Sequence, residues 1–305
     1  MPTISRCAAA LTMVLCLTAS LQAGEILYGI TADDNLITID PTTGQGTLVG
    51  ALELGGSPIA IGAVGLAVSG GNLYAYDSNN NLLRQIDPAT GNIINTVDLG
   101  IGVSVGGSGN LAFSSSGAGV IGSTLDDTGS FGTGTLYSMS TSPGSAAVVN
   151  NNFGFFDGLA FNSGNTLYGL DQGGDTLSTI DPTNGNTTTV GGTGITTIDP
   201  SSGFPIYGLG GLAFDSGGTL FGELANFDPS NPLANLYTIN TTTGAATLVG
   251  AIGIPEVDGI AFLSTTSSVT TPEPSTFALA GGVLVLAGIL WRRRGFLSLP
   301  TSEVT

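Results

Sequence analysis

The sequence contains no histidine and no lysine, and five arginines are its only basic side chains in 305 residues. Four of these arginines lie near the termini, so residues 24–271 hold one base, Arg84, against twenty Asp and Glu, a formal charge of −19. Such a domain lacks the basic surface that binds phosphates, which excludes a nucleic-acid-binding protein. The missing residue types also exclude histidine-based acid–base catalysis, histidine-ligated metals and a lysine Schiff base.

Cysteine is almost absent as well, and both cysteines lie within residues 1–23. This segment has one base, Arg6, then an apolar run over residues 8–17 and a small residue at Ala23. That order is typical of a secretory signal peptide, with cleavage expected between Ala23 and Gly24. A buried N-terminal helix is the alternative. After cleavage the chain has no thiol, so we expect neither disulfides nor cysteine chemistry.

The C-terminal region combines a Pro-Glu-Pro triplet, a short apolar run and an arginine cluster. These are Pro272, Glu273 and Pro274; Phe277 to Trp291; and Arg292, Arg293 and Arg294. The apolar run is shorter than the ~20 residues that span a membrane unaided, but flanking aromatic and basic residues anchor short spans at the interface. The positive-inside rule places the arginines in the cytoplasm and the preceding chain on the exported side.

This tripartite pattern, from Thr271 to Gly295, resembles the PEP-CTERM sorting signal of bacterial exported proteins. The resemblance implies recognition by a membrane enzyme of the exosortase type, with Pro272, Glu273 and Pro274 as the recognition motif. It also implies that the anchor is removed on sorting. A plain C-terminal membrane anchor is the alternative.

Between its ends the chain repeats a unit of 45 to 53 residues. Each unit opens on a phrase close to Gly-Leu-Ala-Phe, at residues 65–68, 110–113, 158–161, 211–214 and 259–262. A Leu-Tyr-Gly phrase follows, then a strand ending in Ile-Asp-Pro-x-x-Gly, then a β-prone run ending in Val-Gly. Four short strands per unit indicate a propeller blade, and no helical periodicity competes with them. The sequence therefore predicts an all-β protein, a β-propeller.

The unit is incomplete at both ends of the repeat region. Residues 25–50 supply strands two to four of a blade, and residues 257–263 supply a first strand alone. Joined, they make a fifth blade, so we predict a ring of five blades closed by N- and C-terminal strands. Six blades are the alternative, because residues 197–203 repeat the Asp-Pro-x-x-Gly phrase; we interpret them as an insertion. The pattern resembles NHL-like propeller repeats, which implies the fold and no particular activity.

Acidic residues offer two candidate roles. The Asp-Pro-x-x-Gly phrases predict hairpin turns, in which Asp accepts a local hydrogen bond and Gly adopts a left-handed conformation. Asp157 and Asp258 precede the first strands of neighbouring blades, so we expect them near one mouth of the central channel. Two carboxylates there would suit Ca²⁺, although the other three blades have no carboxylate at this position and no cofactor is the main expectation.

These observations divide the chain into five parts. They are a signal peptide (1–23), a propeller (24–264), a polar linker with the Pro-Glu-Pro motif (265–274), a short transmembrane helix with its basic stop (275–295) and a cytoplasmic tail (296–305). We expect a membrane-anchored precursor, held in the inner membrane by this anchor, and then a cell-surface or extracellular protein. The expected function is a non-enzymatic binding or structural module associated with exopolysaccharide or other surface proteins. An extracellular carboxylate-dependent glycan-active enzyme and a calcium-stabilised structural module are the alternatives.

Overall fold

The computed structural model describes residues 24–62, 65–101, 110–125, 131–171, 176–195, 207–226 and 233–265. The regular structure of these residues is entirely β. No helix among them is long and apolar enough to cross a membrane. The predicted signal peptide, Pro-Glu-Pro motif, transmembrane helix and tail lie outside the described residues.

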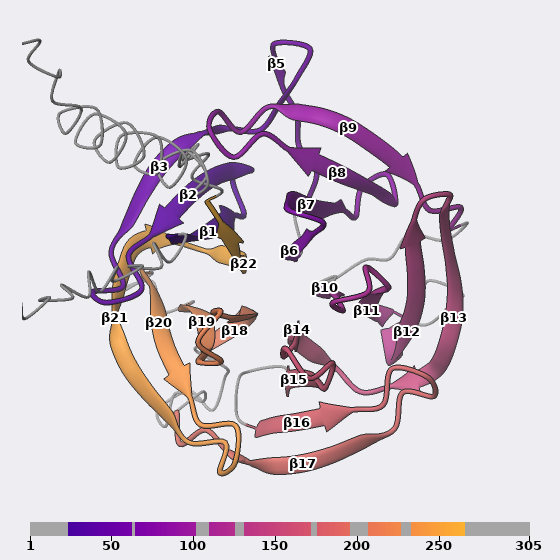
Figure 1. Ribbon diagram of the computed structural model, residues 1–305, viewed down its shortest axis with the longest axis vertical. Helices are drawn as coiled ribbons and strands as arrows, with labels where there is room; N and C mark the ends of the chain where they lie inside the picture. The colour runs from indigo at the N-terminus through magenta and orange to yellow at the C-terminus, as the bar shows by residue number, and fades with distance from the viewer. Residues whose placement is uncertain are drawn as a thin grey trace, which may run out of the picture. The chain divides into compact units, whose positions relative to one another are not determined.

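Five four-stranded antiparallel sheets form a ring around a central channel (Figure 1). In order from the channel outward, the seam blade is β22 (Val257–Ser264), β1 (Glu25–Thr31), β2 (Asn35–Ile39) and β3 (Gly46–Ala51). The second blade is β6 (Leu66–Ser69), β7 (Asn72–Asp77), β8 (Leu82–Ile86) and β9 (Ile93–Asp98). The third is β10 (Asn110–Phe113), β11 (Gly119–Leu125), β12 (Phe131–Thr141) and β13 (Gly144–Phe153).

The fourth blade is β14 (Phe156–Phe161), β15 (Leu167–Asp171), β16 (Thr176–Ile180) and β17 (Thr187–Gly192). The fifth is β18 (Tyr207–Phe214), β19 (Leu220–Asn226), β20 (Leu233–Ile239) and β21 (Ala246–Pro255). The five-bladed prediction is confirmed. The extra phrase at residues 197–203 falls between β17 and β18, outside the described residues. A small hairpin that the sequence did not predict, β4 (Glu53–Leu54) with β5 (Ser57–Pro58), projects from the rim (Figure 1).

The predicted seam is present, because β22 pairs antiparallel with β1 from Glu25↔Ser264 to Thr31↔Val257. Backbone hydrogen bonds extend the pairing beyond both ends of the seam. Ala32 N donates to Glu256 O at 2.8 Å, and Thr265 N donates to Gly24 O at 2.8 Å. The first and last described residues, Gly24 and Thr265, are therefore neighbours.

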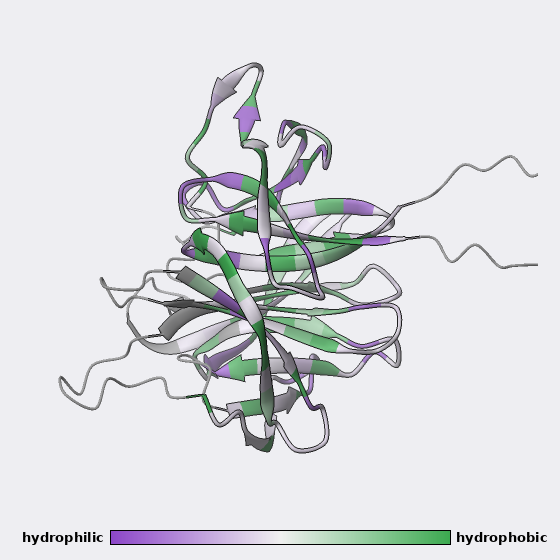
Figure 2. Ribbon diagram, turned by 90° about the vertical axis from the view of Figure 1, so that its left-hand side faces the viewer, coloured by the Kyte–Doolittle hydropathy of each residue, from purple (hydrophilic) through white to green (hydrophobic). Residues whose placement is uncertain are grey.

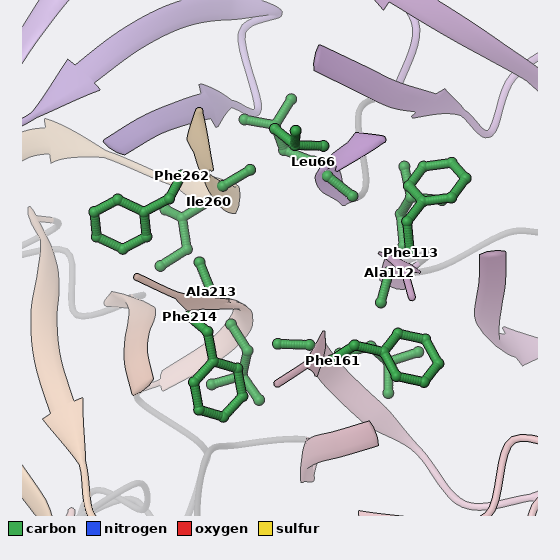
Figure 3. A pocket seen from close by; sticks show the side chains of 15 residues that line it. Leu66, Ala112, Phe113, Phe161, Ala213, Phe214, Ile260 and Phe262 are labelled. Carbon is green, nitrogen blue, oxygen red and sulfur yellow. The ribbon is translucent and has the colours of Figure 1, made fainter. Parts of the chain in front are cut away.

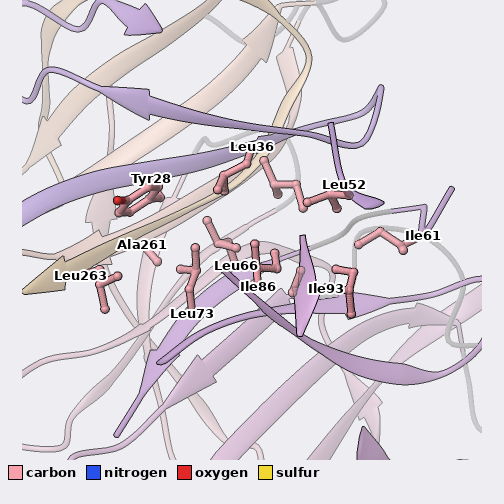
Figure 4. Packing of buried hydrophobic residues seen from close by; sticks show 12 residues of the cluster. Tyr28, Leu36, Leu52, Ile61, Leu66, Leu73, Ile86, Ile93, Ala261 and Leu263 are labelled. Atoms are coloured by element: carbon pink, nitrogen blue, oxygen red, sulfur yellow. The ribbon is translucent and has the colours of Figure 1, made fainter. Parts of the chain in front are cut away.

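Hydrophobic residues concentrate along the strands (Figure 2), and each of five buried clusters fills one junction between adjacent blades. The side chains of each Leu-Ala-Phe phrase pack into two different junctions, because successive side chains of a strand point to opposite faces. Leu111 and Phe113 pack against the second blade, whereas Ala112 packs against the fourth. Figure 4 shows the junction between the seam blade and the second blade, where Ala261 and Leu263 meet Leu66 and Leu73.

Near the outer edge of the ring, glycines of outer strands lie against the backbone of the adjacent blade. A Cβ on Gly250, at the outer strand of the fifth blade, would lie near the backbone O of Thr43 in the seam blade. Gly191 has the same relation to Thr243, and Gly50 to Thr90. At these glycines the turn of the next blade packs against the outer strand and leaves no room for a side chain.

Candidate functional site: the central channel and its two ends

A narrow channel of about 120 Å³ runs along the axis of the ring. Its walls are three consecutive residues from the first strand of every blade: Leu66–Val68, Leu111–Phe113, Leu159–Phe161, Leu212–Phe214 and Ile260–Phe262. Looking along the channel, Figure 3 shows these side chains arranged around the axis with the aromatic rings spread outward. Hydrocarbon side chains thus form the wall.

The channel opens at one end into a basin of about 320 Å³, which we call the hairpin-end basin. Its floor is Val68, Phe113, Phe161, Phe214 and Phe262, and its walls come from the hairpins that join first to second strands. The wall residues are Ser69, Gly70, Ser114, Ser115, Gly117, Asn162, Ser163, Asp215, Ser216 and, at the seam, Glu25. The basin therefore combines an apolar, mainly aromatic floor with hydroxyl, amide and carboxylate walls.

Three of the floor phenylalanines are fixed by aromatic contacts across blade junctions. Ring centroids are 5.7 Å apart for Tyr74–Phe113, 5.5 Å for Tyr168–Phe214 and 5.2 Å for Phe221–Phe262. Tilted and edge-on pairs of this kind are favourable arrangements of aromatic rings. The aromatic residue of the Leu-Tyr-Gly phrase thus supports the phenylalanine of the next blade.

Hydrogen bonds between blades position the basin walls. The backbone N and Oγ of Ser115 both donate to Asn165 Oδ1 at 2.9 Å. Ser216 N donates to Glu25 Oε2 at 2.8 Å, which connects the fifth blade to the seam blade. Ser264 Oγ donates to Glu25 Oε1 at 3.3 Å. The loops from different blades are held together before any ligand arrives.

The opposite end of the channel narrows to a throat lined by Asp258 and by the backbone at Gly65, Gly158, Gly211 and Gly259. Burial raises the pKa of Asp258 to about 8, and the charges of Glu256 and Asp34 add to the rise. Asp258 Oδ1 is shielded from solvent and has no hydrogen-bond partner among the described residues. A protonated carboxyl group fits this environment better than a carboxylate.

The structure tests the turn prediction fully at Asp40 and the prediction about Asp157 and Asp258 only in part. Asp157 lies in β14 of the fourth blade and Asp258 in β22 of the seam blade, so the prediction of neighbouring blades is wrong, because the fifth blade lies between them. The side chain of Asp157 is outside the described part. Within the described ranges no group of three or more Asp, Glu, His or Cys is placed to hold a metal ion. The turn prediction is confirmed at Asp40, whose Oδ1 accepts a hydrogen bond from Thr42 N at 2.8 Å, and Gly44 has a φ of 82°. Hydrogen bonds from Thr42 lower the pKa of Asp40.

Arg84, the single base of residues 24–271, forms a buried ion pair away from the channel. Arg84 Nη2 lies 2.6 Å from Asp77 Oδ2 and Arg84 Nε lies 2.9 Å from the same oxygen. Thr96 Oγ1 accepts from Arg84 Nη1, and Asn80 N donates to Asp77 Oδ1. With its donors engaged inside one blade, Arg84 is a structural residue.

Sequence reasoning did not identify the hairpin-end basin. A signal was present, because Val68, Phe113, Phe161 and Phe214 are each followed by Ser, Asn or Asp at the start of a hairpin. Only the closed ring shows that these apolar–polar steps face one another.

Comparisons with known proteins identify two parts of the chain. Residues 270–294 match the PEP-CTERM protein-sorting motif, which includes the predicted Pro-Glu-Pro triplet and arginine cluster. Residues 151–261 match a domain of unknown function, DUF4394, which covers parts of the third, fourth, fifth and seam blades. No curated protein matches the chain.

Solved structures with similar folds have low sequence identity. A chain of a nidogen/laminin complex is 15% identical with a TM-score of 0.46, over 79% of this chain and 98% of that one. Myxococcus xanthus glutaminyl cyclase is 16% identical with a TM-score of 0.40, over 65% and 69%. A luciferin-regenerating enzyme is 15% identical with a TM-score of 0.45, over 78% and 75%. The chain is a five-bladed β-propeller with a PEP-CTERM sorting motif, and this motif indicates an exported protein sorted by an exosortase.

Proposed function

We propose that the protein is a non-enzymatic binding or structural module, displayed at the cell surface or in the extracellular matrix and associated with exopolysaccharide. The observation that carries this proposal is that the propeller ring closes a few residues before the sorting motif begins. The ring closes at Gly24 and Thr265, and the motif begins at residue 270. The propeller is thus complete before the motif starts. Both ends of the propeller lie beside the hairpin-end basin, because Glu25 lines that basin and pairs with Ser264.

The chemistry of the channel supports binding over catalysis. Its wall is hydrocarbon, and a wall without ionisable groups offers no acid or base to a substrate. The basin contains two carboxylates, Glu25 and Asp215, and both accept hydrogen bonds from backbone N–H groups: Ser216 N to Glu25 and Thr219 N to Asp215. These bonds hold the loops in place, which is a structural use of a carboxylate.

The same two carboxylates are the observation that favours the second candidate, a glycan-active enzyme. Glycoside hydrolysis needs two carboxyl groups on either side of the scissile bond. Incubating the protein with soluble polysaccharides and measuring new reducing ends separates the candidates. We expect no release above the level of a Glu25→Gln, Asp215→Asn double variant. Release that this double variant abolishes would replace the binding proposal with the enzyme.

Surface display is tested with an epitope inserted between Gly55 and Gly56, where no atom lies within 4 Å of a Cβ on either residue. We expect intact cells to bind the antibody, and the tagged protein to copurify with exopolysaccharide. Replacing Arg292, Arg293 and Arg294 by glutamine should leave the precursor unprocessed, because the basic cluster orients the segment. The matched control replaces Arg292, Arg293 and Arg294 by lysine, which keeps the positive charge of the cluster. Unaltered processing of the triple variant would contradict the sorting argument.

A further inference from the structure

We infer that the hairpin-end basin binds a neutral glycan, an inference that rests on the proposed function and assigns it a site and a ligand class. The first support is the floor. Figure 3 shows the rings of Phe113, Phe161, Phe214 and Phe262 largely face-on along the channel. One face of each ring is therefore directed toward the hairpin end, where the same residues form the floor of the basin. The C–H face of a pyranose packs against aromatic faces of this kind.

The second support is the polar wall above the floor. Sugar hydroxyls need acceptors and donors in one place, and the wall supplies carboxylates, an amide and serine hydroxyls. Glu25 and Asp215 keep acceptor capacity, because a carboxylate has about four lone-pair sites and the backbone bonds use only some of them. Ser163 is exposed on the wall. A mostly apolar floor with a few fixed polar groups is the usual chemistry of a small-molecule site.

The charge of the basin selects the class of glycan. Among the described residues, two carboxylates and no basic side chain line it. Arg84, the single base of residues 24–271, donates to Asp77 and Thr96 inside the second blade. Anionic polysaccharides would meet repulsion without a compensating cation, so the electrostatics exclude them. A neutral glycan has no such penalty.

The basin also requires little reorganisation on binding. Bonds between blades fix Ser115 to Asn165 and Ser216 to Glu25, and aromatic contacts across the blade junctions hold three of the floor rings. Fixing a site in advance removes part of the entropy cost of binding. An open basin of about 320 Å³ lies near the lower limit of ligand-pocket volumes, which suits one or two sugar units of a longer chain.

The experiment is affinity electrophoresis of the purified full-length chain, in a detergent without a sugar headgroup, through gels that contain one polysaccharide. The probes are dextran and laminarin, which are neutral, and polygalacturonate, which is anionic. The blocking variants are Ser163→Trp and Ser216→Trp, both at exposed wall positions. The control is Thr219→Trp, an exposed residue of the same hairpin as Ser216 that does not line the basin. Phe214→Leu removes one floor ring and keeps its apolar character, and melting curves verify that every variant is folded.

We expect at least one neutral probe to retard the parent and Thr219→Trp equally, and polygalacturonate to retard neither. The blocking variants should bind about tenfold more weakly, and Phe214→Leu should also weaken binding. Equal retardation of the parent and the folded blocking variants would overturn the basin as the site, while the proposed association with polysaccharide would stand. Retardation by polygalacturonate alone would overturn the neutral class. Absence of retardation by all three probes would overturn the inference, and the copurification experiment then decides the proposed function separately.

Discussion

The seam blade and the second blade have the same four-strand plan, but they hold their inner strands differently. In the second blade, β6 continues into β7 through a hairpin and pairs with it over four residue pairs, from Leu66↔Ala75 to Ser69↔Asn72. In the seam blade, β22 and β1 are opposite ends of the propeller and pair over seven, from Glu25↔Ser264 to Thr31↔Val257. Seven residue pairs also join β18 and β19, which a hairpin connects, so the seam is paired as extensively as a blade with a continuous chain.

The two blades also differ in how they accommodate a buried carboxyl group. The second blade neutralises Asp77, which is 0% exposed, with Arg84. The seam blade has no cation to use at Asp258, whose pKa is raised by burial and by Glu256 and Asp34. A blade can therefore hold a carboxyl group by pairing it or by keeping it protonated. The following predictions test both differences.

The largest effect is expected from removing the seam strand. Deleting Val257–Ser264 exposes the inner edge of β1 and opens two of the five junction clusters, those that contain Ile260 and Ala261. We expect loss of the cooperative thermal transition, followed by circular dichroism, together with aggregation. A deletion variant that melts like the parent would show that the ring does not depend on its seam.

Breaking the ion pair of the second blade should cost less than losing a strand. Arg84→Met leaves Asp77 buried without its cation, and such a loss typically costs about 3–5 kcal/mol. The double variant Asp77→Asn, Arg84→Met removes both charges and should recover much of that stability. Urea unfolding of the parent, the single and the double variant measures the difference. A single variant as stable as the parent would contradict a stabilising role for the pair.

Crowding the seam strand against the second blade should have an intermediate effect. A Cβ on Gly259 would lie 2.7 Å from Leu66 N, a backbone atom that cannot rotate away. We expect Gly259→Ala to destabilise the protein by about 1–3 kcal/mol. The control is Gly164→Ala, in an exposed hairpin where the nearest atom is a side-chain oxygen at 3.3 Å, and a change within about 0.5 kcal/mol is expected. Equal effects of the two substitutions would argue against a close backbone contact at the seam.

The effect expected at Asp258 depends on pH and vanishes at low pH. Its folded pKa of about 8 exceeds the value of about 3.9 for an unfolded Asp, so its contribution to stability is present below pH 4 and is lost as pH rises toward 8. Asp258→Asn removes this titration. We expect the variant and the parent to have similar Tm values at pH 4. At pH 8 we expect the variant to have the higher Tm, because the parent then buries a charge that the amide lacks.

Calcium distinguishes a protonated Asp258 from the alternative, a metal site at the channel mouth. Melting curves of the parent in calcium and in sodium chloride of matched ionic strength should coincide, since screening by salt is general. A rise specific to calcium and lost in Asp258→Asn would contradict a protonated Asp258 and support a bound ion.

Local sequence patterns predicted the parts of the fold that depend on neighbouring residues. Asp40 and Gly44 form their turn through bonds within a few residues, and the strand phrases carry the alternation of a sheet. The sequence did not indicate Asp77 as the partner of Arg84, because the two meet only when β7 and β8 pair. The hairpin-end basin was not predicted, because its phenylalanines are separated by 48 or more residues and meet only around the axis.

The sequence by itself determined the acidic, thiol-poor composition, the sorting motif, the repeat and therefore the number of blades, since each of these depends on residue type and spacing. Tertiary structure alone decided what lies between the blades. Gly250 against Thr43, Gly259 against Leu66 and Ser216 against Glu25 are contacts across junctions between units. The physical reason is that strand pairing within a blade follows the period of one chain segment. Contacts between blades depend on the closure of the whole ring, which brings the two ends of the propeller together.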